Sequence, residues 1–368
     1  MKIQAAVAPS AGEPFVNKPL ELDEPRENEV LVRIQGVGVC HTDLVAQAGV
    51  LPLKFPAVLG HEGAGIVERV GANVRKVKQG DKVILSFLSC GHCPSCEDHE
   101  PAYCYQLTAL NMGGCRPDGS HTLHDGESVV TGSFFGQSSF ANYSLAHERN
   151  IVKILPGVPL EIAGVLGCGV QTGAGAILRS MDCKPGSSLL VIGGGAVGLS
   201  AVMAAKARGV SRIFLGERLE SRRDIALELG VTDFLNPPNG NLADEVLRLL
   251  PNGVNYVLDT TGVPSLLEQV PRLIARRGTF GFVGLPPGSH TSMNLPFGLM
   301  DAMRRGLTLR GIIEGDSDVD GFIETLMEMY LAGRFPFDKL VRTFPLAEIN
   351  SAIKAQHHGE CVKVVLIP

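Results

Sequence analysis

The sequence contains no Trp, only 5 Tyr and no marked excess of either charge, and these scarcities exclude several classes of protein. Lys and Arg number 33 against 38 Asp and Glu, so the net charge is −5 and the pI is near 6.1. A basic footprint for nucleic acid is lacking. No apolar run approaches the roughly 20 residues that span a bilayer. We therefore expect neither a nucleic-acid partner nor a membrane.

A secretory signal and a disulfide framework are not expected either. The first residues, Met1-Lys2-Ile3-Gln4-Ala5, carry no apolar segment followed by a cleavage site. Nine cysteines in a chain of 368 residues without such a signal indicate thiolate chemistry rather than disulfides. We expect a cytoplasmic protein.

The length and the changing texture of the chain predict two domains. Residues 1–155 hold short β-branched runs separated by turns, which is typical of antiparallel strands in a β-rich domain. In residues 156–295, apolar strands alternate with helical stretches, which indicates parallel βαβ units. Residues 296–368 lose that alternation, so we expect them to return to the β-rich domain. The strands and helices expected most clearly are 29–34, 65–70, 82–85, 189–192, 199–208, 212–216, 219–229, 256–259, 280–283 and 362–367.

Four cysteines lie within fifteen residues: Cys90, Cys93, Cys96 and Cys104, spaced C-x2-C-x2-C-x7-C. Four thiolates fill a tetrahedral shell and leave no position for a substrate, which is typical of structural zinc. An iron–sulfur run would place its fourth Cys after three residues and before Pro. Cys104 instead follows after seven residues and precedes Tyr105. The spacing therefore predicts a structural zinc ion.

Three separate segments suggest a second, open metal site. Cys40 follows a glycine-rich strand end, His61 lies in Gly-His-Glu-Gly, and Cys168 lies between two glycines. Each is weak alone, because a lone cysteine is more often a small buried apolar residue. Together, two thiolates and one imidazole would leave the fourth zinc position for water or substrate.

These motifs, in this order, resemble those of the zinc-dependent medium-chain alcohol dehydrogenases over essentially the whole chain. The resemblance rests on residues 60–65, the four-cysteine loop, Gly167-Cys168-Gly169 with Thr172-Gly173, and the glycine turn described below. Residues 134–140, 167–175 and 333–338 are most similar to the bacterial aryl-alcohol (benzyl alcohol) and geraniol dehydrogenases. The resemblance implies an α/β fold, in which a doubly wound, parallel-sheet Rossmann domain is inserted into a β-rich, GroES-like catalytic domain. It also implies a homo-oligomer, either a tetramer or a dimer.

By the same resemblance, Cys40, His61 and Cys168 hold a catalytic zinc ion, so the chain would bind two zinc ions, one catalytic and one structural. Glu62 would lie just behind the catalytic metal. Alternatively, Glu62 is a buried charge that forms an ion pair with an arginine. Zinc can lower the pKa of a bound hydroxyl toward ~7, which prepares an alcohol for hydride transfer.

The proton released by the alcohol needs an exit. Thr42, two residues after Cys40, matches the family position whose hydroxyl receives that proton. Many relatives continue the relay with a histidine three residues further on, where this chain has Val45. Water, the cofactor ribose or His41 would then have to carry the proton onward.

The cofactor turn reads G-x-G-x-x-G between an expected strand and an expected helix, the context that the motif requires. Gly193 permits the turn, Gly195 lets the backbone approach a pyrophosphate, and Gly198 lets helix and strand pack closely. The positive end of the helix then faces the phosphates. The other cofactor contacts that we expect are Thr172, Ala196, Val197 and Arg222, with His41 and Lys363 at the pyrophosphate by resemblance.

Glu217 stands at the end of the second strand, nineteen residues after Gly198. An acid here accepts hydrogen bonds from the adenosine ribose and repels a 2′-phosphate, so NAD is favoured. Arg218 adjoins it and could instead bind a 2′-phosphate, which leaves NADP as the alternative.

By resemblance, five apolar residues contribute to or border a funnel above the zinc: Phe87, Phe134, Phe135, Leu285 and Ile313. Each could instead be a core residue. An apolar pocket with one polar centre suits a primary alcohol on a flat hydrophobic group. No cluster of basic residues adjoins these positions, which disfavours glutathione adducts and phosphorylated substrates.

We therefore expect the reversible, zinc- and NAD-dependent oxidation of a primary aromatic or allylic alcohol to its aldehyde, with a small molecule as partner. Alternatives are another substrate range within the family, an NADP-dependent aldehyde reductase, a zinc-free enone or quinone reductase, and a redox-sensing zinc protein that binds NAD without turnover. The cysteine motifs disfavour the zinc-free enzymes. Thr42 and the open zinc shell disfavour the sensor.

Overall fold

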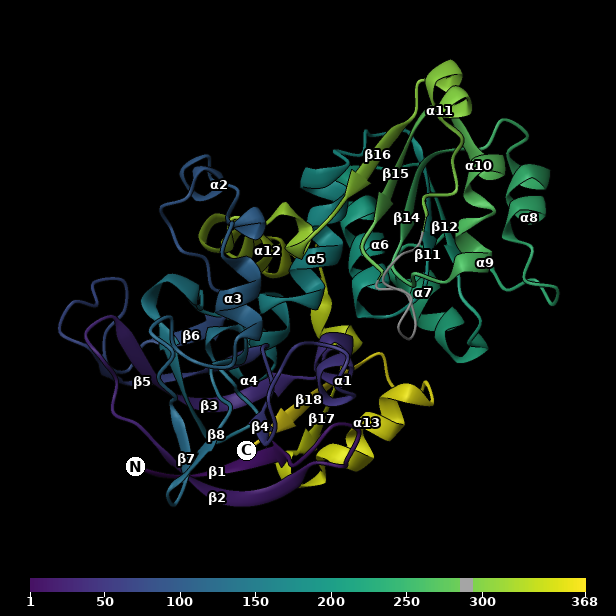
Figure 1. The fold of residues 1–368 in the computed structure, drawn as a ribbon. Helices are drawn as coiled ribbons and strands as arrows, with labels where there is room; N and C mark the ends of the chain where they lie inside the picture. Colours follow the sequence, from purple (N-terminus) through teal and green to yellow (C-terminus); the bar gives the residue numbers. More distant parts are fainter. Residues whose placement is uncertain (285–293) are drawn as a thin grey trace. The chain divides into compact units, whose positions relative to one another are not determined.

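The computed structural model describes residues 1–284 and 294–368, which fall into two compact units (Figure 1). Unit 1 comprises Met1–Gly169, Ser317–Ala332 and Leu340–Pro368. Unit 2 comprises Val170–Asp316 and Gly333–Lys339. One unit is thus built from both ends of the chain, with the other inserted between them.

Unit 1 is built on two sheets in which most neighbouring strands are antiparallel. The first has the order β4-β1-β2-β7-β8. Its strands are β1 (Lys2–Ala8), β2 (Val16–Leu22), β4 (Ala57–Val58), β7 (Leu123–Asp125) and β8 (Ser128–Val130). The second has the order β10-β6-β5-β3-β18-β17, with β9 also paired to β3. Its strands are β3 (Glu29–Gly38), β5 (Gly63–Val70), β6 (Lys82–Leu85), β9 (Tyr143–His147), β10 (Ile151–Lys153), β17 (Val341–Pro345) and β18 (Lys363–Ile367).

Short helices connect and cover these strands. They are α1 (His41–Gln47), α2 (Pro94–Glu97), α3 (Leu107–Met112), α4 (Leu160–Ala163), α12 (Val319–Leu331), α13 (Ile349–His357) and the single turns η1 (Pro101–Tyr103), η2 (Phe134–Gly136), η3 (Glu148–Asn150), η4 (Gly164–Gly167) and η9 (Leu346–Glu348). Helix α4 lies so close to β3 that a Cβ atom at Gly36 would overlap the carbonyl oxygen of Glu161. This packing joins residues 156–169 to unit 1, although the sequence suggested a boundary after residue 155.

Unit 2 is built on a sheet in which the strands pair in parallel, in the order β13-β12-β11-β14-β15-β16. The strands are β11 (Ser188–Ile192), β12 (Arg212–Gly216), β13 (Asp233–Leu235), β14 (Val254–Asp259), β15 (Ile274–Phe282) and β16 (Thr308–Gly311). The chain winds outward from β11 in one direction and from β14 in the other. This reversal is the switch point at which doubly wound sheets bind nucleotides. The predicted fold class is confirmed.

The helices of unit 2 follow the strands in alternation (Figure 1). They are α5 (Gly169–Gly175), the π-turn η5 (Ala176–Ser180), α6 (Ala196–Arg208), η6 (Glu220–Arg222), α7 (Arg223–Leu229), α8 (Leu242–Leu249), α9 (Pro264–Leu267), α10 (Val270–Leu273) and α11 (Leu299–Arg305), with η7 (Glu314–Asp316) after β16. No single described helix is long and apolar enough to cross a membrane, although the bent pair Leu160–Gly167 and Gly169–Ser180 meets that test of length and composition jointly.

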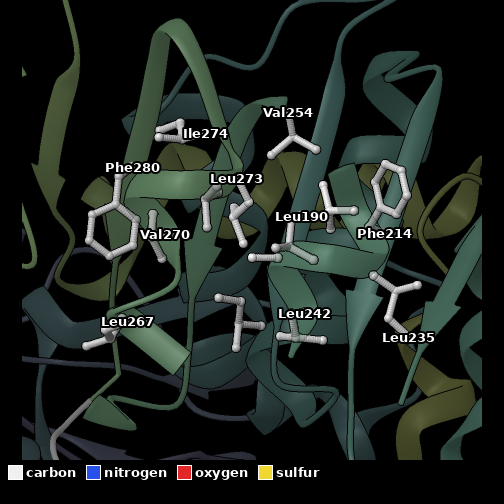
Figure 2. Packing of buried hydrophobic residues seen from close by; sticks show 14 residues of the cluster. Leu190, Phe214, Leu235, Leu242, Val254, Leu267, Val270, Leu273, Ile274 and Phe280 are labelled. Atoms are coloured by element: carbon white, nitrogen blue, oxygen red, sulfur yellow. The ribbon is translucent and has the colours of Figure 1, made fainter. Parts of the chain in front are cut away.

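A buried apolar cluster holds the helices on this sheet (Figure 2). Leu190 and Phe214 come from the strands β11 and β12, and Leu242 comes from α8. Figure 2 also shows side chains from the segment of α9, α10 and β15: Leu267, Val270, Leu273, Ile274 and Phe280. Because β11 is apolar on both faces, its carboxyl end is held firmly where the glycine turn begins.

The return of the chain to unit 1 begins later than the sequence suggested. Residues 296–316 were expected in the β-rich domain, but β16 pairs in parallel with β15, from Thr279 opposite Thr308 to Phe282 opposite Gly311. This pairing keeps α11 and β16 in unit 2, and α12 is the first element of the return.

Candidate active site

The four-cysteine loop brings its sulfur atoms together. The Sγ atom of Cys93 lies 3.5 Å from that of Cys96 and 4.0 Å from that of Cys104, and Cys90 Sγ lies 3.9 Å from Cys96 Sγ. All four sulfurs lie within 4.8 Å of one another. A tetrahedral zinc ion with Zn–S bonds of about 2.3 Å separates its sulfurs by about 3.8 Å. The residues present therefore fit a closed zinc site.

Backbone amides point at these sulfurs, as they do at thiolates. The amides of Cys90 and Gln106 donate to Cys104 Sγ at 3.3 and 3.4 Å, and that of Tyr105 donates to Cys93 Sγ at 3.5 Å. The bond from Tyr105 lowers the pKa of Cys93 to about 6, whereas burial raises the pKa of Cys104 to about 12. Binding of a cation would favour the thiolate form of all four.

A buried amide fixes the start of this loop. The side chain of Asn111, from α3, accepts from the backbone N–H of Leu88 and donates to the Leu88 carbonyl, both at 2.8 Å. The guanidinium of Arg149 donates to the carbonyl of Cys90 at 2.8 Å. The loop is thus tied at two points beside its first cysteine.

The second group of candidate ligands also meets in space, within unit 1. Cys40 precedes α1, His61 lies between β4 and β5, and Cys168 lies between η4 and α5. One ligand atom from each, together with a carboxylate oxygen of Glu62, lies within 4.8 Å of the others. The Nε2 atom of His61 is buried and has no hydrogen-bond partner within the described residues. A metal ion is the partner that this lone pair and the neighbouring sulfurs fit.

Asp43 is a buried residue of this site to which the sequence analysis gave no role. Its carboxylate accepts from the backbone N–H groups of Cys40 at 2.9 Å and Gly60 at 3.0 Å. It also lies 2.9 Å from Nδ1 of His61. A proton on Nδ1 leaves Nε2 as the free lone pair, so Asp43 sets the tautomer that a metal requires.

Electrostatics couples these groups. Although burial opposes the charged form, Asp43 and the Cys40 thiolate hold the pKa of His61 well above its ordinary value. A hydrogen bond from Cys168, together with the nearby positive charges of His61 and Lys363, holds the pKa of Cys40 well below its ordinary value. The buried site therefore favours a thiolate beside a positive charge, and a bound Zn²⁺ would supply that charge in place of a proton on Nε2 of His61.

Glu62 is buried and forms an ion pair with Lys363, not with an arginine. The ammonium of Lys363 lies 2.8 Å from Oε1 and 2.6 Å from Oε2 of Glu62, and it donates to the Val39 carbonyl at 2.9 Å. Burial raises the pKa of Glu62, and the charge of Lys363 opposes that rise. Lys363 was expected at the pyrophosphate, but the pairing of β18 with β3 places its ammonium in this buried cluster.

The aromatic residues expected in the pocket pack against the candidate ligand His61. The ring of Phe135 stacks on the imidazole with centroids 4.3 Å apart, and Phe134 meets it edge-on at 5.5 Å. Thr42 is half-buried, with Oγ1 3.8 Å from Cys40 Sγ, and His41 is exposed. Of the other expected lining residues, Phe87 is buried in unit 1, Ile313 is exposed in unit 2, and Leu285 lies outside the described residues.

The glycine turn of unit 2 has the backbone that a dinucleotide site needs. Gly193 has a φ of +98°, which only glycine adopts readily. A Cβ atom at Gly198 would overlap the Gly193 carbonyl, so helix and strand touch there. A Cβ at Gly195 would meet no heavy atom within 4 Å, so the backbone is open to a ligand. Ala196 and Val197 follow, half-buried, in the first turn of α6.

Glu217 lies beside this turn and is largely buried. Its Oε2 accepts from the Gly194 N–H at 2.8 Å and from Arg222 at 2.9 Å, and its Oε1 accepts from the Leu219 N–H at 2.8 Å. A carboxylate has about four acceptor positions, so one remains for a further donor. Arg218 is exposed.

Thr172, the remaining cofactor residue expected from the sequence, lies in unit 2 and is buried. Its hydroxyl lies 3.4 Å from Oε2 of Glu314, which also accepts from the Gln171 amide at 3.2 Å. Glu314 has a φ of +50°, a strained conformation for a residue with a side chain.

Comparison with known proteins finds matches for both units. Residues 26–156 match the family described as "Alcohol dehydrogenase GroES-like domain", and residues 196–328 match "Zinc-binding dehydrogenase". The chain is 44% identical over 366 residues to geraniol dehydrogenase of Castellaniella defragrans, an alignment that covers 99% of this chain and 97% of the relative.

Two solved structures superpose on the full length of this chain. An alcohol dehydrogenase zinc-binding domain protein from Burkholderia ambifaria superposes with a TM-score of 0.96 at 44% identity, over 100% of this chain and 99% of that one. Benzyl alcohol dehydrogenase from Acinetobacter calcoaceticus superposes with a TM-score of 0.95 at 39% identity, again over 100% and 99%. The GroES-like and Rossmann architecture is thereby confirmed, and the chain belongs to the zinc-dependent medium-chain alcohol dehydrogenases.

Proposed function

We propose that this alcohol dehydrogenase uses NAD to oxidise primary aromatic or allylic alcohols reversibly to aldehydes, with Cys40, His61 and Cys168 as ligands of the catalytic zinc. One observation carries the ligand assignment. The buried Nε2 of His61, without a hydrogen-bond partner in the described residues, lies beside two cysteine sulfurs. An unpaired buried nitrogen is costly, and a metal ion accounts for it.

Zinc, when bound, supplies Lewis-acid polarisation of an alcohol or aldehyde oxygen. The protein's part is to hold the ligands in place. Asp43 orients His61 and binds the backbone N–H of Cys40, so one carboxylate ties two ligands together. Glu62, paired with Lys363, accepts from the Gly169 N–H at 3.1 Å and so holds the turn that carries Cys168.

The proton of the alcohol is proposed to leave through Thr42. A hydroxyl both accepts and donates, and this one stands beside the ligand Cys40. One helical turn later, Val45 offers no group that can carry a proton. The next carrier is therefore water, the ribose of the cofactor or the exposed His41.

The preference for NAD is proposed from Glu217. Its negative charge repels a 2′-phosphate, and its remaining acceptor position suits a ribose hydroxyl. Arg222 is bound to the same carboxylate, which keeps that guanidinium from facing a 2′-phosphate. The exposed Arg218 could bind the 2′-phosphate of NADP, but the negative charge of the adjacent Glu217 would oppose that binding.

The substrate class is proposed from the aromatic rings beside the metal ligand and from the relatives. Both rings make the protein aromatic next to His61: Phe135 stacks on the imidazole and is 7% exposed, and Phe134 lies edge-on and is fully buried. Such surroundings favour a benzyl or allyl group over a small aliphatic chain. Geraniol dehydrogenase and benzyl alcohol dehydrogenase are among the similar proteins, which supports the same class.

The experiment is a turnover assay that follows reduced cofactor with benzyl alcohol, geraniol, cinnamyl alcohol, perillyl alcohol and ethanol, each with NAD+ and NADP+. We expect kcat/KM for the aromatic and allylic alcohols to exceed that for ethanol by about 10-fold or more, since each buried CH₂ contributes about 0.8 kcal/mol. NAD+ should be preferred. A preference for ethanol would contradict the substrate class, and a preference for NADP+ would contradict the interpretation of Glu217.

A further inference from the structure

We infer that Gln137 is a positioning residue for the catalytic zinc, because its side-chain amide fixes the spacing between the turns that carry His61 and Cys168. Gln137 follows η2 and is only 2% exposed. The inference rests on the proposed zinc ligands, and it assigns a role to a residue that touches none of the ligand atoms.

The amide nitrogen of Gln137 bridges two ligand turns. Nε2 donates to the carbonyl of His61 at 2.9 Å and to the carbonyl of Ser86 at 3.1 Å. The hydroxyl of Ser86 in turn donates to the carbonyl of Gly167 at 2.6 Å, directly before Cys168. One nitrogen therefore connects the His61 turn, the end of β6 and the Cys168 turn.

The amide oxygen holds the other side of the His61 turn. Oε1 accepts from the backbone N–H of Gly63 at 3.1 Å and from the hydroxyl of Ser139 at 2.7 Å. All four hydrogen-bonding positions of the Gln137 amide are thereby used. The two carbonyls can only accept and the Gly63 N–H can only donate. If the Gln137 amide were turned by half a rotation, its oxygen would face the two carbonyls and its NH₂ group would face the Gly63 N–H. The orientation of Gln137 is fixed by its neighbours.

The segment around Gln137 is strained. Ser133, Phe135 and Ser138 have φ of +57°, +53° and +58°, a region that residues with side chains rarely adopt. Such conformations persist only where surrounding bonds enforce them, and they gather at functional sites. Here the hydroxyl of Ser144 donates to the Gln137 carbonyl at 2.6 Å, and the strained Phe135 ring stacks on His61. The segment thus holds His61 by its backbone and by its ring.

The role predicted for Gln137 is specific to one metal site. Gln137→Met keeps the length of the side chain and removes all four hydrogen bonds, so the two ligand turns lose their shared tie. We expect the Cys40 site to bind zinc about 10- to 100-fold more weakly, the usual effect of removing a group that orients a metal ligand. The Cys90 site should retain its zinc.

Asn111 provides the matched control. It is also a buried amide, 1% exposed, and it ties Leu88 beside the four-cysteine loop. Asn111→Leu should therefore weaken the Cys90 site and leave the Cys40 site unchanged. The two variants together separate a specific tie from general loss of stability.

The assay follows the transfer of zinc from the full-length, zinc-loaded protein to a chromophoric chelator. The two release phases are assigned with two variants: Cys168→Ser should lack the phase of the Cys40 site, and Cys93→Ser should lack the phase of the Cys90 site. The absorption bands of cobalt(II) bound at the Cys40 site give a second readout, which should shift in Gln137→Met. If the wild type releases a single zinc ion, the proposed ligand set is wrong, whatever Gln137 does.

If the wild type shows two phases and Gln137→Met releases zinc from the Cys40 site at the wild-type rate, the inference is overturned. Equal acceleration at both sites would also overturn it, because that is a folding defect. Should Gln137→Met fail to fold, Ser139→Ala decides the question. This variant removes only one of the four hydrogen bonds of the Gln137 amide, and we expect a smaller acceleration at the Cys40 site. No change there would overturn the inference.

Discussion

Replacing Asp43 by Asn tests how the candidate catalytic site is held together. The carboxylate accepts three hydrogen bonds, from the N–H groups of Cys40 and Gly60 and from Nδ1 of His61. Asparagine has the same shape but a single acceptor oxygen. If that oxygen remains on His61 and Gly60, the new NH₂ group faces the N–H of Cys40, and two donors oppose each other.

The expected magnitude follows from these contacts. A hydrogen bond to a charged group contributes about 1.5–3 kcal/mol, and a buried donor left unpaired costs about 1–3 kcal/mol. Asp43→Asn should therefore lower the free energy of unfolding by about 3 kcal/mol. It should also weaken zinc binding at the Cys40 site by about 10- to 100-fold, because a neutral amide oxygen holds Nδ1 of His61 less strongly than a carboxylate does and the backbone of Cys40 loses its tie.

The assay combines zinc content after dialysis against a chelator with denaturant unfolding. Asp259→Asn is the matched control, because Asp259 is a buried carboxylate that accepts from the hydroxyl and N–H of Thr261 and from the N–H of Gly262. It should lose stability without loss of zinc. If Asp43→Asn keeps both zinc ions under conditions that strip neither from the wild type, Asp43 does not hold the zinc ligands in place.

Three further predictions concern the cofactor, the proton and pH. Glu217→Gly should weaken NAD binding about 10-fold or more and raise NADP use, because Arg218 then faces a 2′-phosphate without an opposing charge; unchanged dissociation constants would contradict this. Thr42→Val should lower kcat about 100-fold while Thr42→Ser retains most activity, and a fully active valine variant would show that the proton leaves by another route. The Arg116 guanidinium, 2.7 Å from the Asp23 carboxylate, lowers the pKa of Asp23, although burial acts in the opposite direction. The ion pair therefore stabilises the fold at pH values above the ordinary pKa of about 3.9. This stabilisation is lost as the pH falls through the lowered pKa. Thermal unfolding should accordingly show Asp23→Asn losing less stability on acidification than the wild type, and parallel curves would contradict the assignment.

Local patterns predicted most of the Rossmann unit. After a polar first residue, β11 and β12 are continuous apolar runs, each followed by a glycine, Gly193 or Gly216, and such runs are typical of buried parallel strands. β16 escaped prediction because its four residues, Thr-Leu-Arg-Gly, have no strong pattern, and only pairing with β15 makes them a strand. The second domain boundary was displaced for the same reason.

The candidate ligands could be found from sequence because each stands in a short motif with its glycines. The residues that hold them could not, since their partners are distant along the chain. Lys363 and Glu62 are 301 residues apart, and Gln137 and His61 are 76 apart. Of these residues, Asp43 had the clearest local signal. An acidic side chain at the third position of a helix often accepts a hydrogen bond from the backbone N–H of the residue that precedes the helix, which here is Cys40.

The assignment of the catalytic zinc ligands is tested most directly by the zinc content of Cys168→Ser, measured together with its turnover of benzyl alcohol and NAD+. We expect about one zinc ion per chain, held by the four-cysteine loop, and no measurable turnover, because the open site has lost a ligand. A variant that keeps wild-type turnover would contradict the assignment of Cys40, His61 and Cys168 as the catalytic metal site.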